Sequence, residues 1–416
     1  MRGSAIIAAM MLVVIGVFSA GGYLGYVSKE TQMAKRMDCS VKALYVAEAG
    51  LERGLADFSS DTDWFDGSIN GFATGTIPIG SYVTIQYNGT NPVSFGNGTY
   101  FVEVSRDATY TSRINLLSTG VFNGVTRKVN ITIRRETIFD YAIGAKGTIS
   151  LSNHSTTDSY NSTIGTYGGS NLFSNGHMRT NAGDGAGGLT AISLTNNATI
   201  NGNAIVGPYG DANSDITTTN NSTISGIKAV APNALLFPSI TPPSTLPVRS
   251  AISLNGNNTT TISQDGQYPS ISISNNSTVR VTGNVTVYVT GNFTLSNNGK
   301  VEINDGASLK LYVNCNQFNI CNNTKMNNNT QNPAKLTIYA TDNVTTVNYS
   351  NNTTFYGTIY APNADFACVN GVDFYGCLVA KTINFSNNPR VHYDEALCGT
   401  GLVAGSMVAD NWREAF

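Results

Sequence analysis

The sequence predicts an α+β protein in which a long N-terminal α-helix beside a small antiparallel β-sheet is followed by a right-handed parallel β-helix (β-solenoid). Three observations predict this fold. Residues 4–27 carry no charged side chain, residues 81–135 alternate apolar and polar side chains in four short runs, and apolar runs recur between asparagine pairs after residue 138. The expected segments are 1–57 for the helix, 58–136 for the small sheet, 137–396 for the β-helix and 397–416 for a C-terminal tail.

Composition narrows the class of protein. The 416 residues suffice for two or three domains at about 100–200 residues each. Charged residues make up 12% of the chain and the formal net charge is −2, whereas typical globular domains are about 25% charged. No nucleic-acid partner is therefore expected. Asn, Thr, Ser and Gly take the places of Lys and Glu, while 41% hydrophobic residues still form an interior. This balance favours an extracellular β-rich protein.

The N-terminal segment is long enough to cross a membrane. Residues from Ser4 to Val27 are uncharged, and a bilayer core needs about 20 such residues. The helical pattern continues beyond them, because apolar residues return at intervals of three, four or seven at Met33, Met37, Val41, Leu44, Leu51 and Leu55. One helix is therefore expected from Ser4 to about Asp57, roughly 80 Å long at 1.5 Å per residue.

The segment RGSAIIAAMMLVVIGVFSAGGYLGY, followed by ALYVAEAGLERGL, resembles the N-terminal helix of PilX-type minor pilins and related type IV pilin-like proteins. The resemblance covers about the first 58 residues. It implies a precursor in the inner membrane, extraction by the membrane assembly machinery, and an extracellular cell-surface filament of this chain with itself or other pilins. The filament core would contain Ile6, Ile7, Met11, Val14, Ile15, Phe18 and Leu24. The same apolar surface would contact lipid in the precursor and neighbouring helices in the filament.

The same resemblance implies a processing site. Members are typically cut after a Gly, and Gly3 precedes the apolar run, so Ser4 would become the new terminus. Major pilins place a Glu at the fifth mature position, where this chain has Ala8. This departure favours a minor or tip subunit, with a role in adhesion. A membrane-anchored surface protein that binds carbohydrate or cells without polymerising stays open as an alternative.

Strand patterns follow a turn-rich linker. The runs SYVTIQY, TYFVEVSR, SRINLLSTGVF and TRKVNITIRR show period-two alternation between Gly and Asn turns. They predict four antiparallel strands beside the helix.

The second half is repetitive. A strand, an Asn-Asn corner and another strand recur, with asparagine pairs at 196/197, 220/221, 275/276, 297/298, 322/323, 351/352 and 387/388. Such repeats predict the coils of a parallel β-helix, with apolar side chains inside and asparagines hydrogen-bonded into ladders along its axis. The run FYGTIYAPNADF at Phe355 is echoed by FYGCLVAKTINF at Phe374, which predicts two adjacent coils.

These runs, with IFDYAIGAKGTISLS and VHYDEAL, resemble the solenoid domain that often follows PilX-type helices in bacterial surface proteins. The proline-rich stretch from Pro232 to Pro247 interrupts the repeats and predicts a strap across the solenoid surface.

Cysteines, sequons and acidic residues supply candidate sites. The six cysteines form no CxxC motif, and disulfides Cys315–Cys321 and Cys368–Cys377 are candidates, although one sequence leaves connectivity open. Candidate glycosylation sites are Asn161, Asn221, Asn276 and Asn352. Asp211, Asn213 and Asp215 alternate as in a calcium loop. Ile216 and Ser222 stand where that loop needs Gly and Glu, which favours an Asx turn over a metal site.

Parallel β-helices also include polysaccharide lyases and hydrolases, so this class is a third alternative. Glycoside hydrolysis needs two carboxylates at a fixed separation, but the acids of the second half are scattered. His154, His177 and His392 lie far apart without a nucleophile motif. We therefore expect no catalytic residue, no cofactor and no enzymatic activity.

Overall fold

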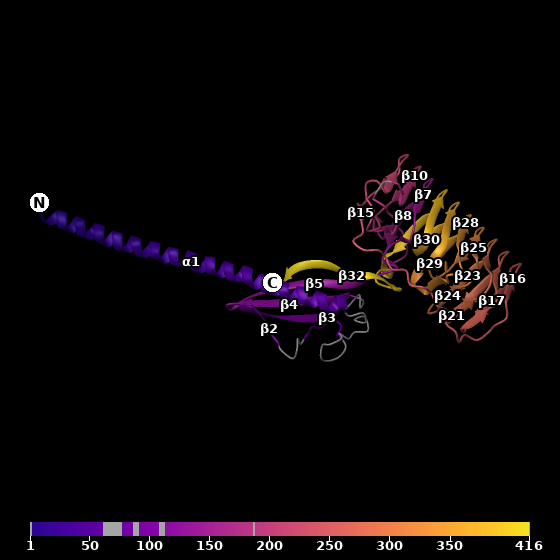
Figure 1. Cartoon of the computed structure of the whole chain (residues 1–416), viewed down its shortest axis with the longest axis horizontal. Coiled ribbons are helices and arrows are strands. Elements are labelled where there is room, and N and C mark those ends of the chain that lie inside the picture. The colour runs from indigo at the N-terminus through magenta and orange to yellow at the C-terminus, as the bar shows by residue number, and fades with distance from the viewer. Residues whose placement is uncertain (1, 61–76, 86–90, 108–112, 186–187, 416) are drawn as a thin grey trace. The chain divides into compact units, whose positions relative to one another are not determined.

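The computed structural model describes residues 2–60, 77–85, 91–107, 113–185 and 188–415. It divides into two compact units. Residues 1–134 with 407–416 form the helix–sheet unit, and residues 135–406 form the parallel β unit. Figure 1 shows the single long helix of the first unit and the many strands of the second.

The helix–sheet unit begins with helix α1, Arg2–Ser60. The long N-terminal helix expected from the sequence is thus confirmed. Its C-terminal half packs on a sheet through the buried side chains of Val46, Leu51 and Phe58. Gly120 on the sheet lets the helix come close, since a Cβ there would lie 2.3 Å from the Ala43 carbonyl oxygen.

The sheet of this unit has six strands. They are β1 (Val83–Thr84), β2 (Val93–Phe95), β3 (Gly98–Arg106), β4 (Arg113–Phe122), β5 (Val125–Thr137) and β32 (Val403–Ala415). The order is β1-β3-β4-β5-β32, with β2 beside β3. Strands β3, β4 and β5 pair antiparallel and bury alternate side chains, as the alternation of the sequence predicts.

Strands β2 and β32 were absent from the sequence prediction. The stretch 397–416, expected as a tail, contains β32 beside β5. Arg127 and Glu414 form a salt bridge between these two strands. The polar run GSMVADNWREA has no regular alternation, so only the free edge of β5 identifies it as a strand.

The parallel β unit contains β6 to β31. They are β6 (Ile143–Ala145), β7 (Ile149–Ser152), β8 (Thr156–Tyr160), β9 (Met178–Thr180), β10 (Ile192–Thr195), β11 (Thr199–Ile200), β12 (Ala204–Val206), β13 (Ile216–Thr218), β14 (Thr223–Ile224), β15 (Lys228–Val230), β16 (Ile252–Leu254), β17 (Thr259–Ile262), β18 (Gly266–Tyr268), β19 (Ile271–Ile273), β20 (Thr278–Val281), β21 (Asn284–Val289), β22 (Phe293–Leu295), β23 (Lys300–Ile303), β24 (Ser308–Val313), β25 (Gln317–Cys321), β26 (Lys325–Met326), β27 (Leu336–Ala340), β28 (Thr346–Ser350), β29 (Thr354–Val369), β30 (Asp373–Ser386) and β31 (Arg390–Asp394). Two short 3-10 helices, η2 (Pro333–Lys335) and η3 (Glu395–Leu397), complete it.

From β6 to β12 and from β16 to β26, each strand pairs in parallel with the third strand after it, as β16 does with β19 and β19 with β22. Successive groups of three strands therefore stack as coils. Phe355 of β29 lies in register with Phe374 of β30, so the echoed runs are adjacent coils, as predicted. The unit is a large, mostly parallel β domain.

The chain does not follow the stack from end to end. It enters in the middle, where β6 pairs with β30 and β7 pairs with β10. It proceeds outward to β13, β14 and β15, and it resumes with β16, which pairs with β19. The later coils return until β31 pairs with β8.

The proline-rich strap connects β15 to β16 over the coils. The Asn181 side chain receives the Leu235 N–H at 2.7 Å, and the Tyr360 hydroxyl donates to the Pro238 carbonyl at 2.7 Å. Val248 then bridges to Gln267 of β18. The strap thus contacts the residue that follows β9, then β29, and its end is followed by a bridge to β18, which agrees with the predicted strap.

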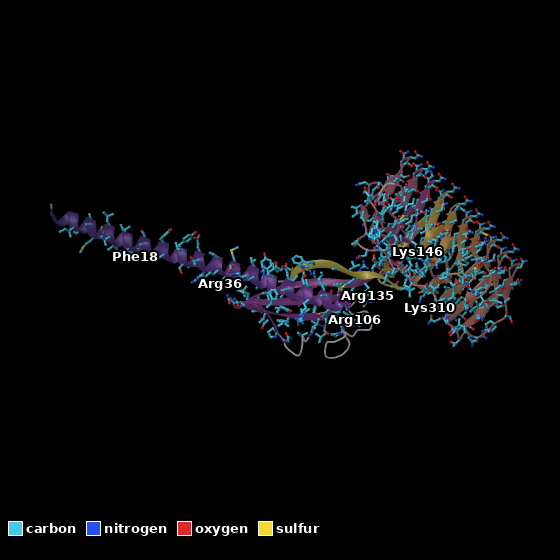
Figure 2. All side chains as sticks on the ribbon, viewed as in Figure 1. Phe18, Arg36, Arg106, Arg135, Lys146 and Lys310 are labelled. Carbon is cyan, nitrogen blue, oxygen red and sulfur yellow. The ribbon has the colours of Figure 1, made fainter. Side chains whose placement is uncertain are left out.

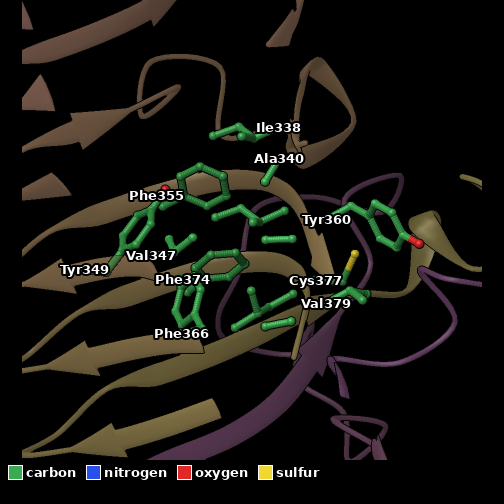
Figure 3. Close-up of a cluster of buried hydrophobic side chains, with 14 of the residues drawn as sticks. Ile338, Ala340, Val347, Tyr349, Phe355, Tyr360, Phe366, Phe374, Cys377 and Val379 are labelled. Atoms are coloured by element: carbon green, nitrogen blue, oxygen red, sulfur yellow. The ribbon is translucent and has the colours of Figure 1, made fainter. Parts of the chain in front are cut away.

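Aromatic side chains fill the middle of the stack. Tyr349, Phe355, Phe366 and Phe374 are at most 1% exposed, and Figure 3 shows them converging from neighbouring coils. The Phe355 and Phe374 rings stack at 4.5 Å between centroids. The register between strands therefore decides which side chains pack together inside the unit, because equivalent residues of successive coils lie next to each other.

Candidate functional site

The N-terminal half of α1 is an apolar surface that no other described part of the chain covers. The side chains expected in a filament core are all exposed in this structure: Ile6, Ile7, Met11, Val14, Ile15, Phe18 and Leu24. Phe18 is 78% exposed, and Figure 2 shows it on the bare part of the helix. By length and composition α1 can cross a membrane, with a mean hydropathy of 2.1 in its most apolar window.

This surface is costly in water. Burying a Val, Leu, Ile, Phe or Met side chain is worth about 1.5–3 kcal/mol, and none of the seven side chains is buried by the described residues. Lipid or other apolar helices would supply it. Gly3 and Ser4 lie in the first turns of α1, and Ala8 is exposed with its neighbours. The peptide bond expected as the cleavage site therefore precedes the exposed segment.

A second feature is a ladder of asparagine side chains along one corner of the parallel β unit. Each Nδ2 donates to the Oδ1 of the next at 2.7–3.2 Å. The members, in spatial order, are Asn220, Asn196, Asn153, Asn387, Asn370, Asn351, Asn322 and Asn297. The link from Asn153 to Asn387 crosses the point where the chain enters the stack. The expected ladder is present.

The corner needs asparagine for its backbone too. Both residues of each pair have positive φ, as at Asn351 and Asn352, each at 59°. Asparagine tolerates this left-handed region better than most residues. The second residue donates its N–H to the first residue of the neighbouring coil, as Asn352 does to Asn370 at 2.9 Å. The first position thus forms the ladder, and the second projects outward.

The candidate glycosylation sites differ in accessibility. Asn221, Asn276 and Asn352 occupy the second corner position and are exposed. Asn161 is partly buried, and its Oδ1 receives the Thr163 N–H at 3.0 Å and the Thr163 hydroxyl at 2.6 Å. The three corner asparagines present free amides to solvent, whereas Asn161 closes a local turn.

The Asp211, Asn213 and Asp215 stretch forms a turn. Asp215 is buried, and its Oδ2 accepts N–H groups of Asp211 at 2.9 Å, Asp184 at 3.2 Å and Gly185 at 3.3 Å. Asp211 accepts the Asn213 N–H at 2.9 Å. Burial alone would raise the Asp215 pKa, but these hydrogen bonds outweigh it and lower that pKa. In the described ranges, no group of three or more His, Cys, Asp or Glu side chains is placed to hold a metal ion.

The suggested disulfides are not formed among the described cysteines Cys315, Cys321, Cys368 and Cys377. Cys321 ends strand β25 and Cys315 precedes it, and an extended strand of this length separates its ends by about 13 Å. A disulfide needs Cα atoms within about 7 Å. Cys368 aligns with Phe385, whereas Cys377 aligns with Thr358, so these two lie on different faces of their coils. Burial raises the pKa of both thiols.

Sequence reasoning missed a cluster around His392. Its Nδ1 lies 2.6 Å from Asp158 Oδ1, and the Tyr167 hydroxyl donates to Asp158 Oδ2 at 2.7 Å. The Tyr167 ring lies 3.9 Å from the His392 ring, and Tyr375 lies 4.7 Å away on the same imidazole. Burial and the Asp158 carboxylate raise the Tyr167 pKa. The cluster holds the segment after β8 against β31, and no periodicity in the sequence indicates it.

Comparisons with known proteins complete these observations. Residues 249–400 match a family described as a domain of unknown function, DUF7305. This segment contains all strands from β16 to β31. A solved structure similar to this chain is that of the competence-associated pilin ComZ from Thermus thermophilus, with 14% identity and a TM-score of 0.37. The match covers 91% of this chain and 97% of that one. No curated protein matches the chain.

Proposed function

We propose that this chain is a structural subunit of an extracellular type IV pilus-like filament, assembled through its N-terminal helix. The observation that carries the proposal is the division of α1 into two halves. Val46, Leu51 and Phe58 are buried on the sheet of the same chain, whereas Val14, Ile15 and Phe18 are more than half exposed. A precursor stored in the inner membrane and later packed against other helices covers the same surface in both states.

The proposal has finer parts. The subunit is a minor or tip component related to PilX-type pilins, with a role in adhesion, and it is cleaved after Gly3. The parallel β unit is a right-handed β-helix displayed on the filament, which is supported by the pairing of each strand from β16 to β26 with the third one after it. The role is structural, with no catalytic activity. A continuous wall of stacked coils with an amide ladder suits a rigid display element.

A charge in the exposed half of α1 tests the filament. Ile15→Lys adds a lysine at the middle of the apolar span, which costs about 2.5–3.5 kcal/mol on insertion scales. We expect sheared surface material to lack fibres containing this variant, as judged by electron microscopy with an antibody to the parallel β unit. Ile164→Lys is the matched control, because Ile164 is 68% exposed and lies outside α1. It leaves fibre yield unchanged.

The same experiment separates the alternatives. Normal fibre yield from Ile15→Lys contradicts the packed-helix core. Wild-type chain that stays in the membrane fraction and never occurs in fibres contradicts polymerisation and favours the membrane-anchored surface protein. The mass of the mature N-terminus checks cleavage after Gly3 separately.

A further inference from the structure

The second corner positions form an exposed row in which one side chain is missing. Along the stack the row reads Asn323, Asn352, Gly371 and Asn388. Its backbone is continuous, since Asn352 donates its N–H to Asn370 and Gly371 donates its N–H to Asn387, both at 2.9 Å. Gly371 keeps the corner conformation with φ of +70°. Only the side chain is absent there.

This absence coincides with a depression on the corner. Its volume is about 550 Å³, and its lining residues are Asn352, Thr354, Gly371, Asp373, Asn388 and Arg390. Asn352 and Asn388 stand two coils apart, about 9.5 Å at the usual strand spacing. A Cβ at Gly371 would lie 2.9 Å from the Asn352 Oδ1. Any side chain at position 371 would therefore intrude between the two asparagines.

The lining is polar and has no net charge. Arg390 binds Asp373 through Nε to Oδ1 at 2.7 Å and Nη2 to Oδ2 at 3.2 Å. The pair neutralises itself, but the carboxylate keeps free lone pairs and the guanidinium keeps free N–H groups. The side chains of Asn352 and Asn388 are exposed and make no side-chain hydrogen bond to the described residues, so each amide offers a donor and an acceptor.

We infer that this depression binds a neutral, hydroxyl-rich ligand: one sugar residue of an uncharged glycan. Ligand pockets of this volume are usually lined by apolar groups, but here every side chain that lines the depression is polar. Paired donors and acceptors match hydroxyl groups, which both donate and accept. A charged sugar gains nothing from the internally neutralised Asp373 and Arg390. Gly371 provides the space, Asn352 and Asn388 flank the ring, and the ion pair supplies fixed partners on the floor.

This inference gives the proposed adhesive role its ligand class, but it does not depend on polymerisation. The test uses the full chain in detergent micelles, so failure to form filaments does not affect it. The probes are methyl glycosides of glucose, galactose and mannose, each beside its uronate. Saturation-transfer NMR reports binding. We expect at least one neutral glycoside to bind and its uronate to bind more weakly.

Two variants assign binding to the depression. Gly371→Asn restores the row and places a side chain between Asn352 and Asn388, and we expect the neutral signal to disappear. Gly306→Asn is the matched control, because Gly306 has φ of +78° and nothing within 4 Å of its Cβ position. It keeps the signal. Asp373→Asn leaves the Arg390 charge uncompensated, so we expect the neutral glycoside to weaken and the uronate to gain binding.

Three results would overturn the inference. They are wild-type protein that binds none of the glycosides, Gly371→Asn protein that binds as the wild type does, and wild-type protein that prefers the uronate. If Gly371→Asn fails to fold, as shown by the loss of the cooperative unfolding transition that Gly306→Asn keeps, the exchange of preference in Asp373→Asn decides. An Asp373→Asn variant with unchanged preference then counts against the site.

Discussion

The N-terminal half of α1 and the parallel β unit are both rich in apolar residues, yet they handle them in opposite ways. The helix exposes Val14 and Phe18, while the coils bury Tyr349 and Phe355 completely. A single helix has no interior in which to bury its side chains, whereas stacked coils enclose one. The coils therefore bury their apolar side chains within the chain, whereas the helix leaves its own exposed.

The largest expected difference between the two regions is in the stability lost when one phenylalanine is removed from each. Phe355→Ala removes a ring that stacks on Phe374 at 4.5 Å, and we expect a loss of about 3–5 kcal/mol in the free energy of unfolding. Phe18→Ala in the same solubilised chain changes that free energy little, because Phe18 is 78% exposed among the described residues. Chemical denaturation in micelles, followed by tyrosine fluorescence, measures both. Equal losses would show that the helix is already packed within the chain.

A smaller difference in stability is expected between the two asparagines of one corner. Asn351→Ala and Asn352→Ala both place alanine at φ of 59°, so they share the backbone strain. Only Asn351 belongs to the ladder, where it donates to Asn322 at 2.8 Å and accepts from Asn370 at 2.9 Å.

At about 0.5–1.5 kcal/mol for each hydrogen bond, Asn351→Ala should be less stable than Asn352→Ala by about 1–3 kcal/mol. Denaturation midpoints give the difference. Identical midpoints would mean that the ladder contributes no stability and that only the backbone conformation selects asparagine.

Asp215 gives the smallest expected effect, and it depends on pH. Burial opposes its ionisation, but hydrogen bonds from the Asp211, Gly185 and Asp184 backbone and from Ser214 lower its pKa below the usual 3.8. A lowered pKa stabilises the folded state fully above the unfolded value. That stability is lost as pH falls through the folded value.

The stability difference between wild type and Asp215→Asn should therefore be constant above about pH 5 and shrink below it. Thermal unfolding at a series of pH values measures it. A difference that stays constant down to the lowest pH would rule out the linkage.

Much of the fold follows from local patterns. The uncharged run from Ser4 to Val27 and the apolar spacing beyond it predict α1, and period-two alternation predicts β3, β4 and β5. The Asn-Asn pairs predict both the corners and the ladder. The missed strand β32 and the unformed Cys368–Cys377 disulfide have a common cause, since each depends on which distant segments are neighbours.

Of the two candidate sites, the sequence predicts one and not the other. The exposed helix could be predicted because a long apolar run needs no tertiary information. The depression at Gly371 could not, since a glycine after an asparagine reads as an ordinary turn. Only the stacking of Asn352 and Asn388 on either side of it turns a missing side chain into a space.

Local sequence patterns predict the helix, the strand periods and the asparagine corners, because these depend on residues within one turn or one strand of each other. Three features are apparent only in the tertiary structure: the order of the coils, the entry of the chain into the middle of the stack, and the pairing of Asp373 with Arg390. Those features depend on register between segments remote in sequence. Register is set by the summed packing of many coils, which no single stretch of the chain encodes.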